Sequence, residues 1–144
     1  MKSDVENTDS LSKCNQHLEN CIRDLDWEVT NPEDMLSWAS KEFGSRAVLA
    51  TSFQRSGMVM FHMAYSEGIP LRIATIDTMR LHDETYAFIK NVEARYGLKV
   101  ERWLPKTSHV ERMVGRFGEF LFFDSKEKQE HCCDVRKTKP RNSM

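Results

Sequence analysis

The regular alternation of short strand-like runs with helical patterns is the feature that most limits how this chain can fold. Strand-like runs are expected at residues 46–51, 71–76 and 98–104. The first of them is apolar with no polar face, as in a strand buried on both sides of a parallel sheet. Helical apolar spacing is expected over residues 58–65, 83–96, 107–116 and 126–137. This order predicts an α/β fold with a twisted parallel sheet flanked by helices.

The N-terminal part of the chain has a different pattern. Residues 1–10 are polar and are expected to form a tail, and residues 11–25 have helical spacing. Asn31 and Pro32 then predict a capped helix start, with the helix running to Phe43. We therefore expect an N-terminal tail and helix over residues 1–30 and one domain over residues 31–144, since 144 residues suit a single domain.

Charge and hydropathy exclude several classes of protein. The formal net charge is −1, which argues against a general nucleic-acid or membrane-surface binder. The mean hydropathy is −0.59, and no apolar run approaches the roughly 20 residues of a membrane span. Neither a nucleic acid nor a membrane is an expected partner. Because the first ten residues resemble no secretory signal, the four cysteines predict a cytoplasmic protein rather than a disulfide framework.

Two loops follow strand-like runs and are expected at the ligand-binding edge of the sheet. In the loop over residues 52–57, hydroxyls, backbone amides and a helix N-terminus could hold an anion, and Arg55 could add a hydrogen bond to it. The loop lacks the glycines of a Walker or dinucleotide-binding motif. An ordinary capped turn explains this loop about as well.

The second loop, residues 77–82, has a similar place in the pattern. Asp77 could accept hydrogen bonds from a ribose or an adenine edge, and Arg80 could face an anion. His82 is interpreted as a helix-entry residue with local hydrogen bonds.

A pair of adjacent cysteines, Cys132 and Cys133, precedes Arg136, Lys137 and Lys139. Nearby cationic side chains lower the pKa of a thiol and so favour the thiolate, which is the form that binds a metal ion or acts as a nucleophile. Two cysteines do not complete a four-ligand iron–sulfur site, and half-buried cysteines beside a solvated basic face are the alternative. Cys14 and Cys21, seven residues apart, are interpreted as small apolar residues of the N-terminal helix.

Read together, three ordered motifs resemble the adenylyl-sulfate and phosphoadenylyl-sulfate reductase family of assimilatory sulfate reduction, from about residue 32 to residue 140. The first motif is T/S-S-F-x-x-x-G/D-M/V, the second is D-T-G-R-L-x-P-E-T-Y, and the third is C-C-x-V/I-R-K-x-x-P. The matching residues are Thr51, Ser52, Phe53, Gln54, Gly57 and Met58; Asp77, Thr78, Arg80, Leu81, Glu84, Thr85 and Tyr86; and Cys132, Cys133, Val135, Arg136, Lys137 and Pro140.

The resemblance implies a fold like that of the adenine nucleotide α-hydrolases and a nucleotide-binding site. The substrate-binding residues that it implies are Ser52, Phe53, Gln54, Gly57, Asp77, Thr78 and Arg80. Cys132 and Cys133 would be two ligands of a [4Fe-4S] cluster. Most members of this family that carry such a cluster use adenylyl sulfate. Lys137 would act electrostatically between cluster and substrate. The implied partners are adenylyl sulfate or AMP, and thioredoxin or glutaredoxin, and a homo-oligomer stays open.

In the family, a cysteine thiolate from a Glu-Cys-Gly segment attacks the sulfate sulfur, AMP leaves, and reduction of the S-sulfonate releases sulfite. This sequence contains neither that segment nor the C-x-x-C with the remaining cluster ligands. We therefore expect the C-terminal part of the family fold to be missing and the isolated chain to be inactive. The alternatives are a phosphoadenylyl-sulfate reductase and a non-catalytic nucleotide- or metal-binding module, including a zinc site with His131. Met79 replaces the glycine of the second motif and puts its backbone conformation in question.

Overall fold

The computed structural model describes residue 16 and residues 19–20, 22–23 and 29–142. It divides into two compact units, Met1–Met35 and Leu36–Met144. The expected tail over residues 1–10, Cys14 and Cys21 lie outside the described residues. The described residues of the expected helix over 11–25 are helical, and the boundary expected between residues 30 and 31 stays a prediction. No helix in the described part of the chain is long and apolar enough to cross a membrane.

Helix α2, Pro32–Phe43, begins and ends where the sequence predicts. The Asn31 side-chain Oδ1 accepts a hydrogen bond from the amide of Asp34 at 2.8 Å, which satisfies one free amide of the first turn. Gly44 then takes a positive φ of 52° and begins a short 3₁₀ turn, η1, Gly44–Arg46.

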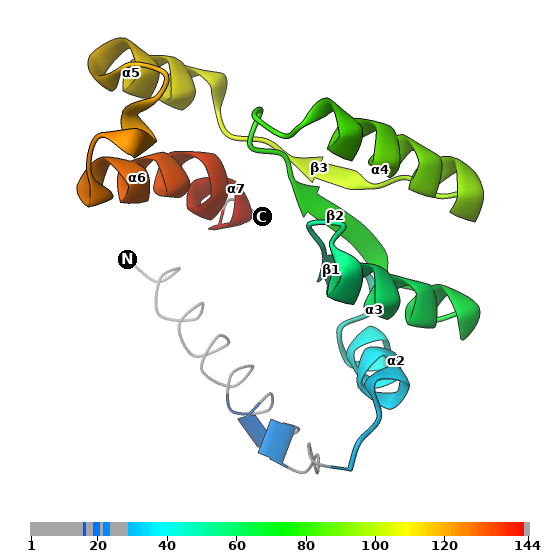
Figure 1. The fold of residues 1–144 in the computed structure, drawn as a ribbon. Helices are drawn as coiled ribbons and strands as arrows, with labels where there is room; N and C mark the ends of the chain where they lie inside the picture. The colour runs from blue at the N-terminus through cyan, green and yellow to red at the C-terminus, as the bar shows by residue number, and fades with distance from the viewer. Residues whose placement is uncertain (1–15, 17–18, 21, 24–28, 143–144) are drawn as a thin grey trace, which may run out of the picture. The chain divides into compact units, whose positions relative to one another are not determined.

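Three parallel strands form the sheet in the order β1-β2-β3 (Figure 1). They are β1, Val48–Ala50; β2, Arg72–Ile76; and β3, Glu101–Trp103. Leu49 lies opposite Ile73, and Thr75 lies opposite Arg102. The expected α/β class is therefore confirmed, with strands shorter than the runs that predicted them.

Helices α3, Arg55–Ser66, and α4, Asp83–Tyr96, follow β1 and β2 in the chain (Figure 1). Helix α4 has the predicted bounds, and Gly97 caps it at a φ of 65°. Helix α3 begins three residues before the predicted start, so Arg55 and Gly57 belong to its first turn rather than to a loop. The two helices and the strands share one core of buried side chains: Leu49, Phe53, Phe61, Ile73, Ile89, Val92 and Val100.

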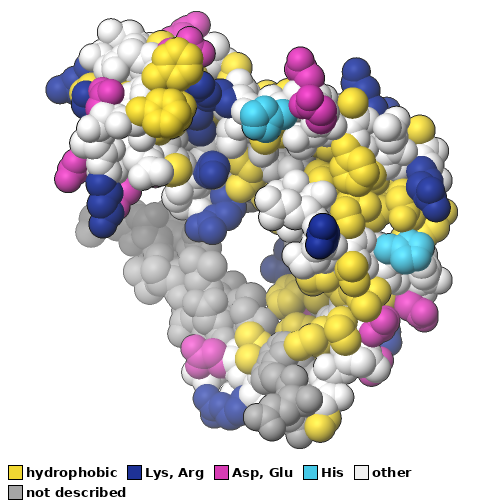
Figure 2. All heavy atoms as spheres, in the orientation of Figure 1, with side chains coloured by type: hydrophobic (Ala, Val, Ile, Leu, Met, Phe, Trp, Pro, Cys, Tyr) yellow, Lys and Arg dark blue, Asp and Glu magenta, His cyan; other side chains and the backbone are white. Residues whose placement is uncertain are grey.

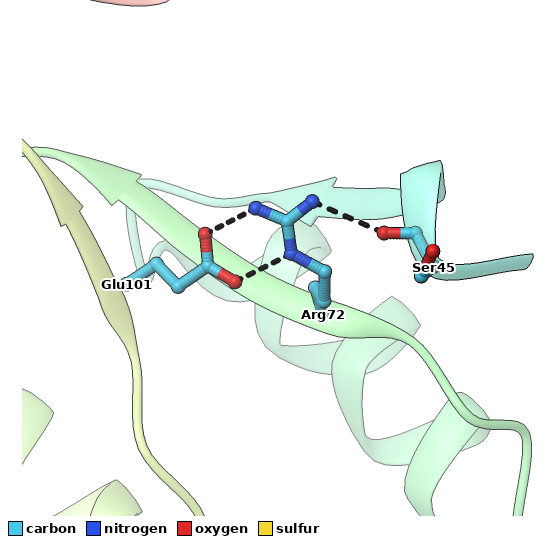
Figure 3. Close-up of polar contacts among 3 residues, drawn as sticks. All are labelled: Ser45, Arg72 and Glu101. Carbon is cyan, nitrogen blue, oxygen red and sulfur yellow. Dashed lines mark hydrogen bonds and ion pairs between the residues drawn. The ribbon is translucent and has the colours of Figure 1, made fainter. Parts of the chain in front are cut away.

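At the edge of the sheet where the strands begin, Arg72 joins β2 to β3 (Figure 3). Its Nε and Nη2 donate to the Glu101 carboxylate at 2.6 and 2.7 Å, and its Nη1 donates to the Ser45 carbonyl oxygen at 3.1 Å. This bidentate pair fastens the strands at the edge away from the expected ligand.

The remaining elements form a helical group with its own apolar cluster. These elements are α5, Thr107–Phe117; η2, Leu121–Phe123; α6, Lys126–Cys133; η3, Asp134–Thr138; and α7, Lys139–Asn142. Their buried side chains are Val110, Met113, Leu121, Cys132 and Val135. Figure 1 shows the strands pointing toward the side of the sheet where this group lies.

The helix expected over residues 126–137 is not a regular α-helix. It ends at Cys133 and continues as the π-helical turn η3, in which the amide of Lys139 donates to the carbonyl oxygen of Asp134. Pro140 explains the change, because a proline has no amide to donate to the carbonyl four residues back and its ring clashes with that turn.

Candidate functional site

A cleft of about 310 Å³ opens where strands β1 and β2 end. Among the described residues, its lining combines hydroxyl groups with aliphatic side chains and one cation. The lining residues are Ala50, Thr51, Ser52, Thr75, Ile76, Thr78, Leu81, Thr85 and Lys137. The volume is at the lower end of the range for small-molecule sites, and the place matches the rule for parallel α/β sheets.

The two loops that form the floor of the cleft are built in the same way. After β1, the Thr51 hydroxyl accepts a hydrogen bond from the amide of Phe53 at 3.0 Å; after β2, Asp77 Oδ1 accepts from the amide of Met79 at 2.9 Å. Phe53 and Met79 both take a left-handed conformation, with φ of 61° and 60°. Each turn leaves its middle residue, Ser52 or Thr78, on the lining of the cleft.

Met79 keeps the backbone conformation expected of the glycine that it replaces in the second motif. It adopts the positive φ that a glycine would take there, and its side chain is 46% exposed, so nothing blocks it. The backbone geometry is therefore kept at the steric cost of a non-glycine residue in the left-handed region.

Gly57 is required by packing rather than by its own φ. A Cβ atom built on it would lie 2.1 Å from Thr51 Oγ1, far inside van der Waals contact. The first turn of α3 can therefore approach the end of β1 only because residue 57 has no side chain. This approach brings the positive end of the α3 dipole to the loop that carries Ser52.

Of the seven predicted substrate-binding residues, Ser52 and Thr78 line the cleft. Phe53 is buried in the core of the sheet, and Gln54 is the N-terminal cap position of α3. These two residues and Gly57 do not line the cleft; they shape the loop that does.

Asp77 occupies a different place from the one expected. It is 5% exposed, its amide donates to the Trp103 carbonyl oxygen at 3.0 Å, and its Oδ1 accepts from Met79 and from the Tyr86 hydroxyl at 2.8 Å. Burial, followed by the hydrogen bond to Asp77, raises the pKa of Tyr86 above its ordinary value. Asp77 thus holds the loop to β3 and α4 from within.

Arg80 is not among the residues that line the cleft. Its Nη1 donates to the Glu119 carbonyl oxygen at 2.8 Å, and its guanidinium lies 5.1 and 4.9 Å from the ring centres of Phe120 and Phe122. The expectation that Arg80 faces an anion in the cleft does not match this placement, because its side chain is engaged with the segment between α5 and α6.

Lys137 is the cation that the described part of the chain places on the cleft, and it comes from the π-helical turn η3 rather than from the sheet. Arg136, the residue before it, is 6% exposed and donates from Nη1 to the Thr78 carbonyl oxygen at 2.7 Å. The structure therefore brings part of the third motif to the first two.

The two cysteines of the third motif differ in exposure. Cys132 is 7% exposed within the apolar cluster of the helical group, whereas Cys133 is exposed. Within the described ranges, no group of three or more His, Cys, Asp or Glu side chains is arranged to hold a metal ion. Two thiols do not make a four-ligand cluster site, so the described residues do not by themselves fit the implied cluster.

Six lining residues were not among the predicted site residues: Ala50, Thr51, Thr75, Ile76, Leu81 and Thr85. Leu81 and Thr85 occur in the second motif, so the motif itself could have indicated them. Thr75 lies inside β2, where an apolar run gives no sign of which side chain faces a ligand. His82 is the N-terminal cap position of α4, and its carbonyl oxygen accepts from the amides of Thr85 and Tyr86. This agrees with its interpretation as a helix-entry residue.

Comparison with known families gives a match over most of the chain. Residues 46–144 match the family model described as phosphoadenosine phosphosulfate reductase domain. This region contains all three motifs, the sheet and the cleft.

Curated relatives resemble the chain over part of their length. An adenosine 5′-phosphosulfate reductase of Allochromatium vinosum is 38% identical over 107 residues, which is 74% of this chain and 41% of the relative. One of Burkholderia cepacia is 37% identical over 93 residues, 65% of this chain and 37% of the relative. The chloroplastic 5′-adenylylsulfate reductase 1 of Arabidopsis thaliana is 31% identical over 78% of this chain and 24% of the relative. The chain thus spans well under half the length of these relatives.

A solved structure supports the fold. The crystal structure of phosphoadenylyl-sulfate reductase from Candida auris, a phosphate complex, matches with a TM-score of 0.64 and 22% identity. The match covers 89% of this chain and 59% of that chain. It establishes the shared architecture.

Proposed function

Because the chain belongs to the phosphoadenosine phosphosulfate reductase domain family, we propose that its cleft binds the adenylyl part of a sulfonucleotide. The observation that carries this proposal is the convergence of three separate segments on one cleft. Ser52 follows β1, Thr78 follows β2, and Lys137 comes from η3. Hydroxyl donors beside a helix N-terminus and an ammonium group suit an anionic nucleotide.

Adenylyl sulfate is the substrate that we propose. The curated relatives quoted above are named for it, and the double cysteine of the third motif is present. Lys137 would lie near the sulfate end, where a cation stabilises negative charge as it moves onto the departing AMP. Phosphoadenylyl sulfate is the alternative substrate.

For the whole protein we propose the reduction of adenylyl sulfate to sulfite and AMP. A cysteine thiolate would attack the sulfate sulfur, the bond between sulfur and the phosphate oxygen would break, and AMP would leave. Two electrons from a thioredoxin- or glutaredoxin-type dithiol would then release sulfite. The described residues of this chain supply the binding cleft for that reaction and not the nucleophile.

The iron–sulfur cluster remains a prediction. If it forms, Cys132 and Cys133 would supply two of its ligands, and the others would have to come from outside the described residues. Anaerobic reconstitution with iron and sulfide tests it: absorption at about 400 nm that is lost in Cys133→Ser supports the cluster, whereas bound zinc without this band supports a zinc site. A cytoplasmic location also stays a prediction, and a reducing compartment would keep the exposed Cys133 thiol free.

Isothermal titration calorimetry tests the proposed function. We expect the chain to bind AMP and adenylyl sulfate with a dissociation constant below about 1 mM. Ser52→Ala and Lys137→Met should weaken binding. Ser45→Ala and Lys90→Met are the matched controls, because both residues lie outside the cleft. No heat of binding at millimolar nucleotide would refute the proposal, and a preference for phosphoadenylyl sulfate would change the substrate.

A further inference from the structure

Two arginines connect the loop after β2 to the helical group, and they do so in opposite directions. Arg80 reaches from the loop to the carbonyl oxygen of Glu119, with a nitrogen–oxygen distance of 2.8 Å. Arg136 reaches from η3 to the carbonyl oxygen of Thr78, at 2.7 Å. We call these two side chains and their two acceptors the arginine clasp.

The Arg80 half of the clasp lies against aromatic rings. Besides its hydrogen bond, Arg80 lies over Phe120 and Phe122, and Glu119 Oε1 is 3.7 Å from its Nη1. The face in Figure 2 has exposed hydrophobic rings with Lys or Arg side chains beside them over the segment that joins α5 to α6. A guanidinium held by a carbonyl, a carboxylate and two rings has a fixed direction.

The Arg136 half is buried, and its burial is energetically unfavourable. Arg136 is 6% exposed, and among the residues that the structure describes no acceptor lies within hydrogen-bond reach of its Nε. A buried cation that is incompletely hydrogen-bonded destabilises a fold, and an apolar side chain of similar size would avoid this cost. The hydrogen bond from Arg136 to Thr78 satisfies only part of this buried guanidinium within the described residues.

The bond joins two lining segments of the cleft. Thr78 lies on the cleft from the side of the sheet, and Lys137, next to Arg136 in the chain, lies on it from the helical group. Fixing Arg136 to the Thr78 carbonyl oxygen therefore fixes the distance between the Lys137 segment and the sheet. Arg80 fixes the same loop two residues further on.

We infer that Arg80 and Arg136 are positioning residues that set Lys137 against the nucleotide loop without contacting the ligand themselves. This inference rests on the proposed function. It also gives Arg80 a role different from the anion contact expected from the sequence.

A double-mutant cycle on the full 144-residue chain tests this inference, with the affinity for adenylyl sulfate as the readout. Arg136→Met should weaken binding about tenfold in the chain that retains Lys137. In the Lys137→Met background the same change should have less than about a twofold effect, because the group that it positions is gone. Arg136→Lys should restore part of the affinity, and Arg80→Met should behave like Arg136→Met.

Arg95→Met is the matched control. Arg95 also lies over an aromatic ring, that of Tyr96, but at the far end of α4 from the loop. Its loss should leave the affinity unchanged.

Hydrogen exchange supplies a readout that needs no ligand. Arg136→Met should increase amide exchange at residues 78–81 while exchange in β1 and β2 stays as in the wild type. Unchanged exchange at residues 78–81, or an equal loss of affinity with and without Lys137, would overturn the inference while the proposed function stands. A wild-type chain that binds no nucleotide would instead refute the proposed function, and the positioning role with it.

Discussion

The side chains of Thr51 and Asp77 hold the backbone of the loops that follow β1 and β2. Each accepts a hydrogen bond from the amide two residues later, and each is followed by a non-glycine residue at a φ of about 60°. These local bonds help to hold a conformation that a side chain at that residue disfavours. Ser52 and Thr78 face the cleft as a consequence.

Gly57→Ala should disrupt the first turn. Because the new Cβ would meet Thr51 Oγ1 at 2.1 Å, we expect a loss of about 1–3 kcal/mol in the free energy of unfolding, together with weaker nucleotide binding. Chemical denaturation measures the first and calorimetry the second.

Gly115 is the matched control for this substitution. It lies within α5, and nothing stands within 4 Å of a Cβ built on it, so Gly115→Ala should stabilise the chain by about 0.5–1 kcal/mol. Equal effects of the two substitutions would contradict the packing argument.

Met79→Gly should be tolerated, because glycine removes the steric cost of the left-handed conformation and adds entropy to the unfolded chain. We expect a change within about 0.5 kcal/mol of the wild type in the free energy of unfolding, and a loss of about 1–2 kcal/mol for Met79→Val. Met60 has a similar exposure within α3, and Met60→Gly should cost about 1 kcal/mol. If Met79→Gly were as damaging as Met60→Gly, the strain at residue 79 would be refuted.

Tyr86 links α4 to the loop after β2, and the link should depend on pH. Since the pKa of Tyr86 is raised in the folded chain, its contribution to stability is complete below about pH 10, the unfolded value, and is lost as the pH rises through the raised pKa. Arg102, 5.6 Å from the ring centre, opposes the shift. Tyr86→Phe should lower the free energy of unfolding by about 1 kcal/mol at pH 7.

The difference in stability between wild type and Tyr86→Phe should shrink as the pH is raised above about 10. Urea denaturation of both proteins from pH 7 to pH 11 measures it. Tyr65→Phe, on the exposed face of α3, serves as the control. A difference that stays constant over this range would show that the hydrogen bond to Asp77 is not the cause.

The helices were predicted more accurately than the strands and turns because helix ends have local chemical signs. Asn31 with Pro32 marks the start of α2, and Gly97 marks the end of α4. The start of α3 was misplaced because Gln54, its N-terminal cap position, is not one of the residue types that commonly mark a helix start. The π-helical turn was missed because Pro140, its cause, lies after the turn and looks like an ordinary helix end.

Side-chain direction limits what the sequence could predict of the site. The order of strands and helices indicated that both loops follow strand ends, and the structure has Ser52, Thr78 and Lys137 on the lining of one cleft. The motifs did not indicate that Phe53 and Asp77 turn inward or that Arg80 turns toward Glu119. Those directions depend on a local hydrogen bond, a positive φ or a partner about 40 residues away, and residue type carries none of this information.

The segments that line the cleft belong to two parts of the fold, and each part has its own apolar cluster. One part is the sheet with α3 and α4, and the other is the helical group. The first positions the strand ends, and the second carries Cys132 and leads into the turn with Lys137. The hydrogen bonds of Arg80 and Arg136 connect the loop after β2 to the helical group. We therefore expect a nucleotide site that needs both the sheet and the helical group.

Nuclear magnetic resonance mapping of AMP binding to the 144-residue chain tests this claim most directly. We predict that added AMP shifts the amide signals of Ser52, Thr75, Thr78, Thr85 and Lys137, which line the cleft from the sheet, its loops, α4 and η3. The signals of Arg72 and Glu101, at the opposite edge of the sheet, should stay in place. Shifts confined to that opposite edge, or no shifts at millimolar AMP, would contradict nucleotide binding in the cleft.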